Sequence, residues 1–207
     1  MGGYDFVLFD LGGVLVRLRG AQVLRELSGI GTDSEVWDKW MTCRWVRTFE
    51  RGRCTPEEFA TGLVADWRLP VTPAQFLDGF LTFPEGLYDG ALELVSAARR
   101  HARVGCLSNS NAPHWQFMRA EYGFDGIFDV TFLSHEIGYV KPDAELFEHV
   151  ARALGVPARR VAFVDDNLGN VRAAQAIGFA ARQVQGTEEA RAALRELGVL
   201  PGGWPLS

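Results

Sequence analysis

The sequence predicts an α/β protein whose core is a parallel sheet with helices on both faces, interrupted after the first strand by an all-helical insert. From residue 84 onward, short β-branched strands alternate with helical patterns of about 10–15 residues, as in βαβ units. Residues 20–83 contain amphipathic helical patterns only. A chain of 207 residues, 47% hydrophobic and 23% charged, has the composition of a globular protein with a sizeable core.

The first strand is expected at residues 4–10, an aromatic and β-branched run that stops at a carboxylate followed by Gly12 and Gly13. The insert is expected to hold four helices, at 21–29, 33–50, 56–67 and 73–82. The second has a cap-like start in Asp33-Ser34-Glu35, and Thr55-Pro56-Glu57-Glu58 predicts a capping box for the third. We therefore expect residues 1–19 and 84–207 to form the core domain and residues 20–83 to form a separate helical domain.

The remaining elements alternate along the chain. Helices are expected at 88–100, 113–122, 143–154, 168–177 and 187–197. Strands are expected at 103–107, 129–133, 161–164 and 180–184, and residues 201–207 resemble a loose tail. Because a helix separates each strand from the next, the sheet should be parallel, with all carboxyl ends at one edge.

Charge and cysteine content restrict the partners and the compartment. The net charge is −5, and no Lys/Arg cluster is present to track nucleic acid or an anionic membrane. No apolar run reaches the ~20 residues that span a bilayer, and the N-terminus does not resemble a signal peptide or an anchor. The three widely spaced cysteines fit neither a disulfide framework nor a zinc site, which favours the reducing cytoplasm. The sequence is compatible with a monomer or a homodimer.

Polar residues follow three of the expected strands: Asp10, then Ser108-Asn109, then Asp165-Asp166-Asn167. Ligands of open parallel sheets bind beyond the carboxyl ends of the strands, so these side chains should converge. Neighbouring carboxylates repel one another unless a cation lies between them, and oxygen ligands of this kind suit Mg²⁺. The alternative is that each Asp only caps a helix or a loop, as Asp165-Asp166-Asn167 would by directly preceding one.

Lys141 stands out because 19 of the 21 basic residues are Arg, and Lys39 is the only other Lys. Pro142 restricts the backbone of Lys141 and fixes its direction. An ammonium group at the same sheet edge would pair with a carboxylate nucleophile and with a phosphate oxygen. The alternative is an ordinary surface lysine.

Four segments in order resemble the motifs of the haloacid dehalogenase (HAD) superfamily. They are Phe9-Asp10-Leu11-Gly12-Gly13-Val14-Leu15, Leu107-Ser108-Asn109, Ser134-x-Glu136-x-Gly138-x-x-Lys141-Pro142 and Phe163-Val164-Asp165-Asp166-Asn167-x-x-Asn170. The helical insert resembles the small helical cap of that superfamily. The resemblance covers almost the whole chain and implies a Rossmann-like core with an inserted cap, acting on a small phosphorylated metabolite.

The resemblance also implies a role for each motif residue. Asp10 would be the nucleophile and would form an aspartyl-phosphate that water then hydrolyses. Mg²⁺ would be held by Asp10, by the backbone carbonyl of Gly12 and by Asp165-Asp166, with Asp166 as the principal ligand of that pair. Ser108 and the backbone N–H of Asn109 would hold phosphoryl oxygens, and Lys141 would offset negative charge.

Gly12 departs from the usual pattern, because phosphatases of this superfamily carry an acid–base Asp at that position. General acid–base help is worth roughly 10²–10⁴-fold, so its loss predicts a slow enzyme, a good leaving group or a substitute acid. His114 is one candidate for that acid. A subset that resembles sugar-1-phosphate phosphatases shares the Gly and the pattern Glu50-Arg51-Gly52, so a sugar phosphate is a possible substrate.

Substrate specificity is expected to come from the helical cap. Arg47 and Trp45 are candidate substrate-binding residues there, because Arg grips anionic groups and Trp stacks on rings; Arg17, Arg19 and Arg44 lie nearby in the sequence. The alternative is that all five are packing residues and solvated charges.

Two other functions fit the same residues. A 2-haloacid dehalogenase uses the same Asp nucleophile without a metal, although Asp165-Asp166 would then be electrostatically costly beside Asp10. A non-catalytic HAD-like binding protein is the third possibility, since Gly12 removes one functional group.

Overall fold

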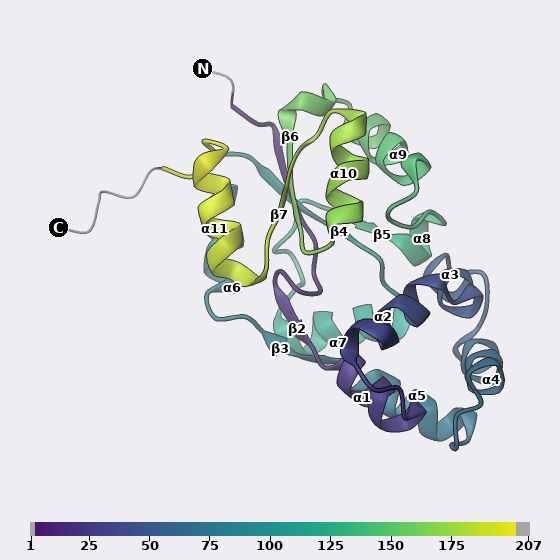
Figure 1. Cartoon of the computed structure of the whole chain (residues 1–207). Helices are drawn as coiled ribbons and strands as arrows, with labels where there is room; N and C mark the ends of the chain where they lie inside the picture. Colours follow the sequence, from purple (N-terminus) through teal and green to yellow (C-terminus); the bar gives the residue numbers. More distant parts are fainter. Residues whose placement is uncertain (1–2, 202–207) are drawn as a thin grey trace.

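The computed structural model describes residues 3–201, so all of the predicted tail at 201–207 except Pro201 lies outside the described residues. Its centre is a five-stranded sheet in the order β5-β4-β1-β6-β7, with every neighbouring pair parallel (Figure 1). The strands are β1 (Phe6–Phe9), β4 (Arg103–Ser108), β5 (Val130–Leu133), β6 (Val161–Asp165) and β7 (Ala180–Gln183). The predicted parallel α/β sheet is confirmed, and β1 is its central strand.

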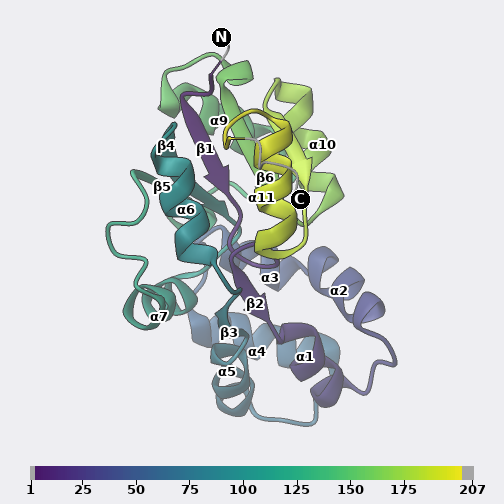
Figure 2. The ribbon, with the colours of Figure 1, turned by 90° about the vertical axis from the view of Figure 1, so that its left-hand side faces the viewer.

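Helices cover both faces of this sheet (Figure 2). Val7 and Phe9 of β1 point to a core formed with α6 (Ala91–Arg99), α7 (Ala112–Tyr122) and α11 (Gly186–Glu196). Phe6 and Leu8 point to the opposite core, formed with α9 (Ala144–Leu154) and α10 (Leu168–Ile177). The alternation of neighbouring residues between two cores is why β1 is apolar throughout.

The helical insert has its own aromatic core. It consists of α1 (Gly20–Ser28), α2 (Asp33–Thr42), α3 (Arg44–Glu50), α4 (Pro56–Trp67) and α5 (Pro73–Leu81). Trp40, Phe59 and Phe80 lie at its centre, with ring centroids 5.3–6.2 Å apart. The insert therefore has an apolar cluster separate from those of the sheet, and the division into a core domain and a helical domain at 20–83 stays a prediction.

The starts of the insert helices follow capping rules. The predicted capping box between Thr55 and Glu58 is present, and Thr32 with Glu35 forms another before α2. The prediction of one helix over 33–50 is wrong, because the chain turns at Cys43 (φ −70°, ψ 123°) and separates α2 from α3. The break has no Pro or Gly to announce it.

Two short strands were not predicted. β2 (Val16–Leu18) and β3 (Pro84–Leu87) form an antiparallel ribbon at the two points where the chain enters and leaves the insert (Figure 2). Two short elements complete the described chain, α8 (Ser134–Ile137) and a 3₁₀ turn at Ala158–Arg160. None of the helices in residues 3–201 is long and apolar enough to cross a membrane.

Candidate active site

Three carboxylates meet at the carboxyl edge of the sheet. Asp10 follows β1, while Asp165 ends β6 and Asp166 follows it. Oxygen atoms of the three lie within 4.8 Å of one another. Asp10 and Asp165 are buried and Asp166 is partly buried. The predicted convergence of the strand ends is thus present in the structure.

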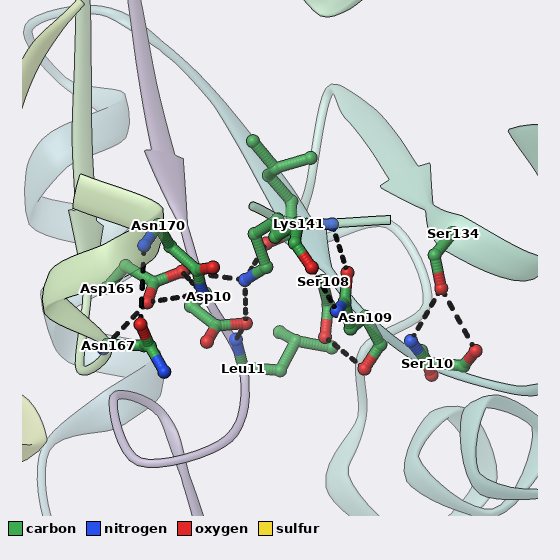
Figure 3. A network of polar contacts seen from close by, with 11 residues as sticks. Asp10, Leu11, Ser108, Asn109, Ser110, Ser134, Lys141, Asp165, Asn167 and Asn170 are labelled. Carbon is green, nitrogen blue, oxygen red and sulfur yellow. Dashed lines mark hydrogen bonds and ion pairs between the residues drawn. The ribbon is translucent and has the colours of Figure 1, made fainter. Parts of the chain in front are cut away.

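Lys141 occupies the space between these strand ends (Figure 3). Its ammonium nitrogen lies 2.9 Å from Asp10 Oδ1, and it donates hydrogen bonds to Asp165 Oδ2 at 2.7 Å and to the Leu107 carbonyl at 3.0 Å. Lysine has three donors, and each has its own acceptor here. With 2% exposure, Lys141 is not a surface lysine.

The two adjacent aspartates differ in what their side chains contact. Asp165 accepts hydrogen bonds from the Asn167 backbone N–H, from Asn170 Nδ2 and from Lys141. Its oxygens are therefore occupied by the protein. Asp166 instead lines the pocket described below, as does Asp10. Of the pair, Asp166 is the carboxylate available to a ligand in the pocket.

Gly12 and Gly13 bring the loop after β1 close to Asp166. Gly13 has φ +73°, a conformation that favours glycine, and a Cβ on it would overlap the Asp166 carboxylate. Gly12 lines the pocket with its backbone. Gly13 therefore allows the main chain to approach Asp166 closely, whereas the missing side chain of Gly12 leaves room for Leu18.

The end of β4 is tied to the Lys141 loop. Asn109 Nδ2 donates to the Lys141 carbonyl at 3.0 Å, and Asn109 Oδ1 accepts from the Lys141 backbone N–H at 2.8 Å. Ser110 is held in turn by Ser134, whose hydroxyl accepts from one backbone group of Ser110 and donates to the other. Ser108, 4% exposed, lines the pocket beside Asp10. These bonds fix the loop that carries Ser108 and Asn109 (Figure 3).

The electrostatics of the cluster are unbalanced. Burial raises the pKa of Asp10 to about 8, against the opposing effect of Lys141 and with further increases from Asp165 and Asp166. Burial and Asp165 raise the pKa of Asp166 to about 6. Asp10 and Asp165 raise the pKa of Lys141 even though burial lowers it. Three carboxylates face one ammonium group, so a divalent cation with oxygen ligands fits the remaining negative charge.

A pocket of about 360 Å³ opens above this cluster, within the usual range of small-molecule sites. Its polar end includes Asp10, Gly12, Ser108, Asn109, Lys141 and Asp166, and Ser110, Asn111, Asn167 and Asn170 also line the pocket. Apolar side chains from the ribbon, the insert and α7 form much of the remaining wall: Val16, Leu18, Trp37, Trp40, Met41, Phe80, Phe83, Pro84 and Met118. Leu18 and Met41 are 44% and 38% exposed. The pocket thus joins a charged, polar end to an apolar wall.

The sequence reasoning missed Glu50 as a functional candidate. This residue ends α3, is partly buried and lines the pocket. Burial raises the pKa of its carboxyl to about 7, although Lys141, Arg47 and Arg51 act to lower it. The only signal in the sequence was its place in the Glu50-Arg51-Gly52 pattern, which says nothing about the direction of the side chain.

Arg47 and Trp45, predicted to bind substrate, are not among the pocket-lining residues. Arg47 forms an ion pair with Asp143, and the Trp45 indole donates to Asp66 at 3.0 Å. Their proposed substrate contacts find no support in this geometry.

His114 does line the pocket, but its Nε2 lies 2.8 Å from the Phe80 carbonyl, and burial lowers its pKa to about 4. It is therefore neutral near pH 7 and a poor proton donor.

The chain belongs to the haloacid dehalogenase-like hydrolase family, whose model matches residues 4–178. Because that match covers most of the chain and includes the whole acidic cluster, the protein is a HAD-like hydrolase.

Two curated relatives are named phosphatases. The sesquiterpene phosphatase AstK of Aspergillus oryzae is 30% identical over 185 residues, which cover 85% of this chain and 87% of the relative. The D-ribitol-5-phosphate phosphatase of Bacteroides thetaiotaomicron is 25% identical over 182 residues, covering 84% and 88%. A HAD family enzyme from the same bacterium, solved with magnesium and inorganic phosphate, has a TM-score of 0.73 and 26% identity, covering 88% of this chain and 95% of that one.

Proposed function

We propose that this hydrolase is a Mg²⁺-dependent phosphomonoesterase that forms an aspartyl-phosphate on Asp10. The observation that carries the proposal is the Asp10–Lys141 pair at the polar end of the pocket, 2.9 Å apart and next to Asp166. An anionic carboxylate approaches an anionic phosphate only where cations offset both charges. The phosphatase names of two relatives and the magnesium and phosphate in a similar structure support the same reaction.

Each residue then has a defined role. Asp10 attacks phosphorus, and Ser108 and the Asn109 backbone N–H hold phosphoryl oxygens. Lys141 orients Asp10 and favours its ionised form, against the opposing effect of burial. Mg²⁺ would be held by Asp10, by the Gly12 carbonyl and by Asp166, with Asp165 positioned behind it, and when bound it supplies positive charge for the phosphoryl oxygens.

The apolar wall favours a phosphate ester of a largely apolar alcohol. Leu18 and Met41 offer no hydrogen bonds to sugar hydroxyls, whereas they and the aromatic ring of Trp37 would remove an alkyl or isoprenoid chain from water. The names of the relatives include both kinds of substrate, a sesquiterpene and a sugar alcohol phosphate. A sugar phosphate is therefore the second candidate, supported by the shared Gly12 and Glu50-Arg51-Gly52 pattern.

The other two functions are less well supported. Among residues 3–201, Lys141 is the only cation in contact with this cluster, so a metal-free dehalogenase would leave three carboxylates with one neutralising partner. A binding protein without catalysis would have no need for a lysine held by three acceptors against Asp10.

The test is phosphate release with Mg²⁺ and again with EDTA, using n-butyl, n-hexyl and n-octyl phosphate beside glycerol 3-phosphate. We expect Mg²⁺-dependent release, with kcat/KM rising about two- to fourfold per methylene until the wall is filled. Leu18→Gln should flatten this series, and Leu81→Gln should not, because Leu81 is equally exposed but lies outside the pocket. Release in EDTA at the full rate contradicts the metal role, and a preference for glycerol phosphate contradicts the apolar substrate.

A further inference from the structure

Hydrolysis of an alkyl phosphate requires a proton for the departing alkoxide, and the loop after β1 offers none at Gly12. Two pocket-lining carboxylic acids lie outside the acidic cluster, Glu50 and Asp38, and both come from the helical insert. Lys141 contributes to the environment of Glu50, which places Glu50 at the polar end of the pocket. Asp38 is exposed and lies on α2, the helix that also contributes Trp37 and Met41 to the apolar wall.

We propose that Glu50 is the general acid that protonates the leaving alcohol, in place of the carboxylic acid missing at Gly12. The inference rests on the phosphomonoesterase function proposed above and deepens it.

Residues that precede and follow Glu50 in the sequence contact the core of the protein. Arg47 and Arg51 both donate to the Asp143 carboxylate, two residues after Lys141. Gly52 has φ +66° and approaches the His135 carbonyl so closely that a Cβ would overlap it. These contacts fix the end of α3 against the core, and Glu50 lines the same pocket as the Asp10–Lys141 pair.

Glu50 also has no competing partner. Arg47 and Arg51 form their ion pairs with Asp143, and within residues 3–201 no ion pair or side-chain hydrogen bond engages the Glu50 carboxylate. Glutamate next to two arginines would ordinarily be neutralised by one of them. Here its carboxyl is left facing the pocket, where a substrate oxygen can meet it.

The protonation of Glu50 suits the role. The charged groups that face it are Lys141 from the core and Arg47 and Arg51 from its own segment, and all three favour the ionised form. Burial outweighs them and raises the pKa to about 7, so both forms are populated at neutral pH. The acidic cluster does not set this value, since none of its members contributes to the shift.

The proposed step transfers the phosphoryl group to Asp10 and a proton from Glu50 to the alcohol. A carboxylate oxygen of Asp10 forms a bond to phosphorus while the bond from phosphorus to the alcohol oxygen breaks. The electron pair of that bond stays on the alcohol oxygen, which takes the proton of Glu50 and leaves as the neutral alcohol. Glu50, now a carboxylate, then removes a proton from the water that hydrolyses the aspartyl-phosphate, which restores both residues.

The test compares leaving groups in Glu50→Gln. For n-hexyl phosphate, whose alkoxide leaves poorly, we expect kcat/KM to fall by about 10²–10³-fold. The anion of 4-nitrophenyl phosphate leaves without a proton. Its kcat/KM should stay within about threefold of the wild-type value, because kcat/KM includes only the steps up to the first irreversible one, which is the release of 4-nitrophenolate. Its kcat should fall and a burst of nitrophenolate should appear, since the water attack loses its base. The wild-type kcat/KM for n-hexyl phosphate should decline above a pKa near 7, and the variant should lack this decline.

Matched variants separate the explanations. Glu57→Gln makes the same change at an exposed position of α4 outside the pocket and should match the wild type for both esters. Equal losses for both esters in Glu50→Gln would show a structural role and overturn the assignment. A leaving-group-dependent loss in Asp38→Asn but not in Glu50→Gln would transfer the role to Asp38. If the wild type releases no phosphate from 4-nitrophenyl phosphate with Mg²⁺, the proposed function itself is overturned, and the role of Glu50 with it.

Discussion

Arg47 donates hydrogen bonds to both carboxylate oxygens of Asp143, at 2.9 and 2.8 Å, and so joins α3 of the helical insert to the start of α9. Arg51 adds a second ion pair to the same carboxylate. Asp143 follows Lys141 and Pro142 in the chain, so the contact joins the insert to the loop that presents the central lysine. These charged side chains are only 25–32% exposed, so water and salt screen the pairs incompletely.

The first prediction concerns this contact. Asp143→Asn should lower kcat/KM for n-hexyl phosphate by about three- to tenfold, because both ion pairs lose their anionic partner and the amide offers only one acceptor oxygen to the two guanidinium groups. The wild-type rate should fall toward that of the variant in 1 M NaCl, whereas the variant should change little. Asp66→Asn is the control, since Asp66 pairs with Arg44 entirely within the insert. Equal salt sensitivity of Asp143→Asn and wild type would contradict a role for this ion pair.

The second prediction separates the two adjacent aspartates. Asp166→Asn should raise the Mg²⁺ concentration needed for half-maximal activity at least tenfold, while the melting temperature in EDTA stays the same or rises. Asp165→Asn should also lower the stability by about 3–5 kcal/mol, because Lys141 would lose a buried anionic partner. Melting curves in EDTA and Mg²⁺ titrations of activity provide both readouts. Similar behaviour of the two variants would show that their different contacts do not matter.

The third prediction tests why lysine stands at 141. Lys141→Arg should reduce kcat at least 100-fold and destabilise the protein by about 2–4 kcal/mol, since a planar guanidinium cannot place its donors on the three acceptors that surround this 2%-exposed side chain. Lys39→Arg is the matched control, because Lys39 lies over the Trp67 ring, where Arg is accepted equally well. Measurements of kcat and of urea unfolding for both variants test whether the losses occur only at position 141.

The fourth prediction concerns the nucleophile. Asp10→Asn should abolish phosphate release while the far-UV circular dichroism spectrum stays that of the wild type, because the change keeps the shape of the side chain and removes its charge. Wild-type protein quenched in acid during turnover should carry one phosphoryl group on the peptide that contains Asp10. Turnover by Asp10→Asn at the wild-type rate would exclude the covalent mechanism.

The fifth prediction follows from the pKa of Glu50, which burial raises from 4.5 to about 7. The folded protein holds this proton more tightly than the unfolded chain does, so the resulting stabilisation is complete below pH 4.5 and is lost as the pH rises through 7. Glu50→Gln has no such proton. The free energy of unfolding of the variant minus that of the wild type should therefore increase by about 1–3 kcal/mol between pH 5 and pH 8. Urea unfolding in EDTA measures it, and a flat difference would refute the raised pKa.

The sequence predicted the parts of the fold that depend on local pattern. Each buried strand of the sheet is a continuous apolar run between helices, so β1 and β6 were recognisable. The ribbon was not, because β2 has three residues and β3 contains a Pro and a Gly, both rare within strands. The break at Cys43 depends on how α2 and α3 pack, which no local residue announces.

The site residues also fall into a group that the sequence predicted and a group that it did not. Asp10, Lys141, Asp165 and Asp166 follow from the topology, because the ends of parallel strands meet at one edge. The insert residues could not be assigned in this way. Whether Arg47 or Glu50 faces the pocket depends on the rotation of α3 against the core, and the sequence pattern of a seven-residue helix does not determine that rotation.

The β2–β3 ribbon separates the residues proposed to act on the phosphate from those proposed to contact the alcohol. Before and after it lie the groups proposed to bind and attack phosphate, and between its strands lies a segment that carries Glu50 and most of the apolar wall. If the roles proposed above hold, the selection of the alcohol and its protonation both depend mainly on this inserted segment. In an evolving lineage, replacing residues 20–83 would change both properties at once and leave the phosphoryl chemistry of the sheet edge intact.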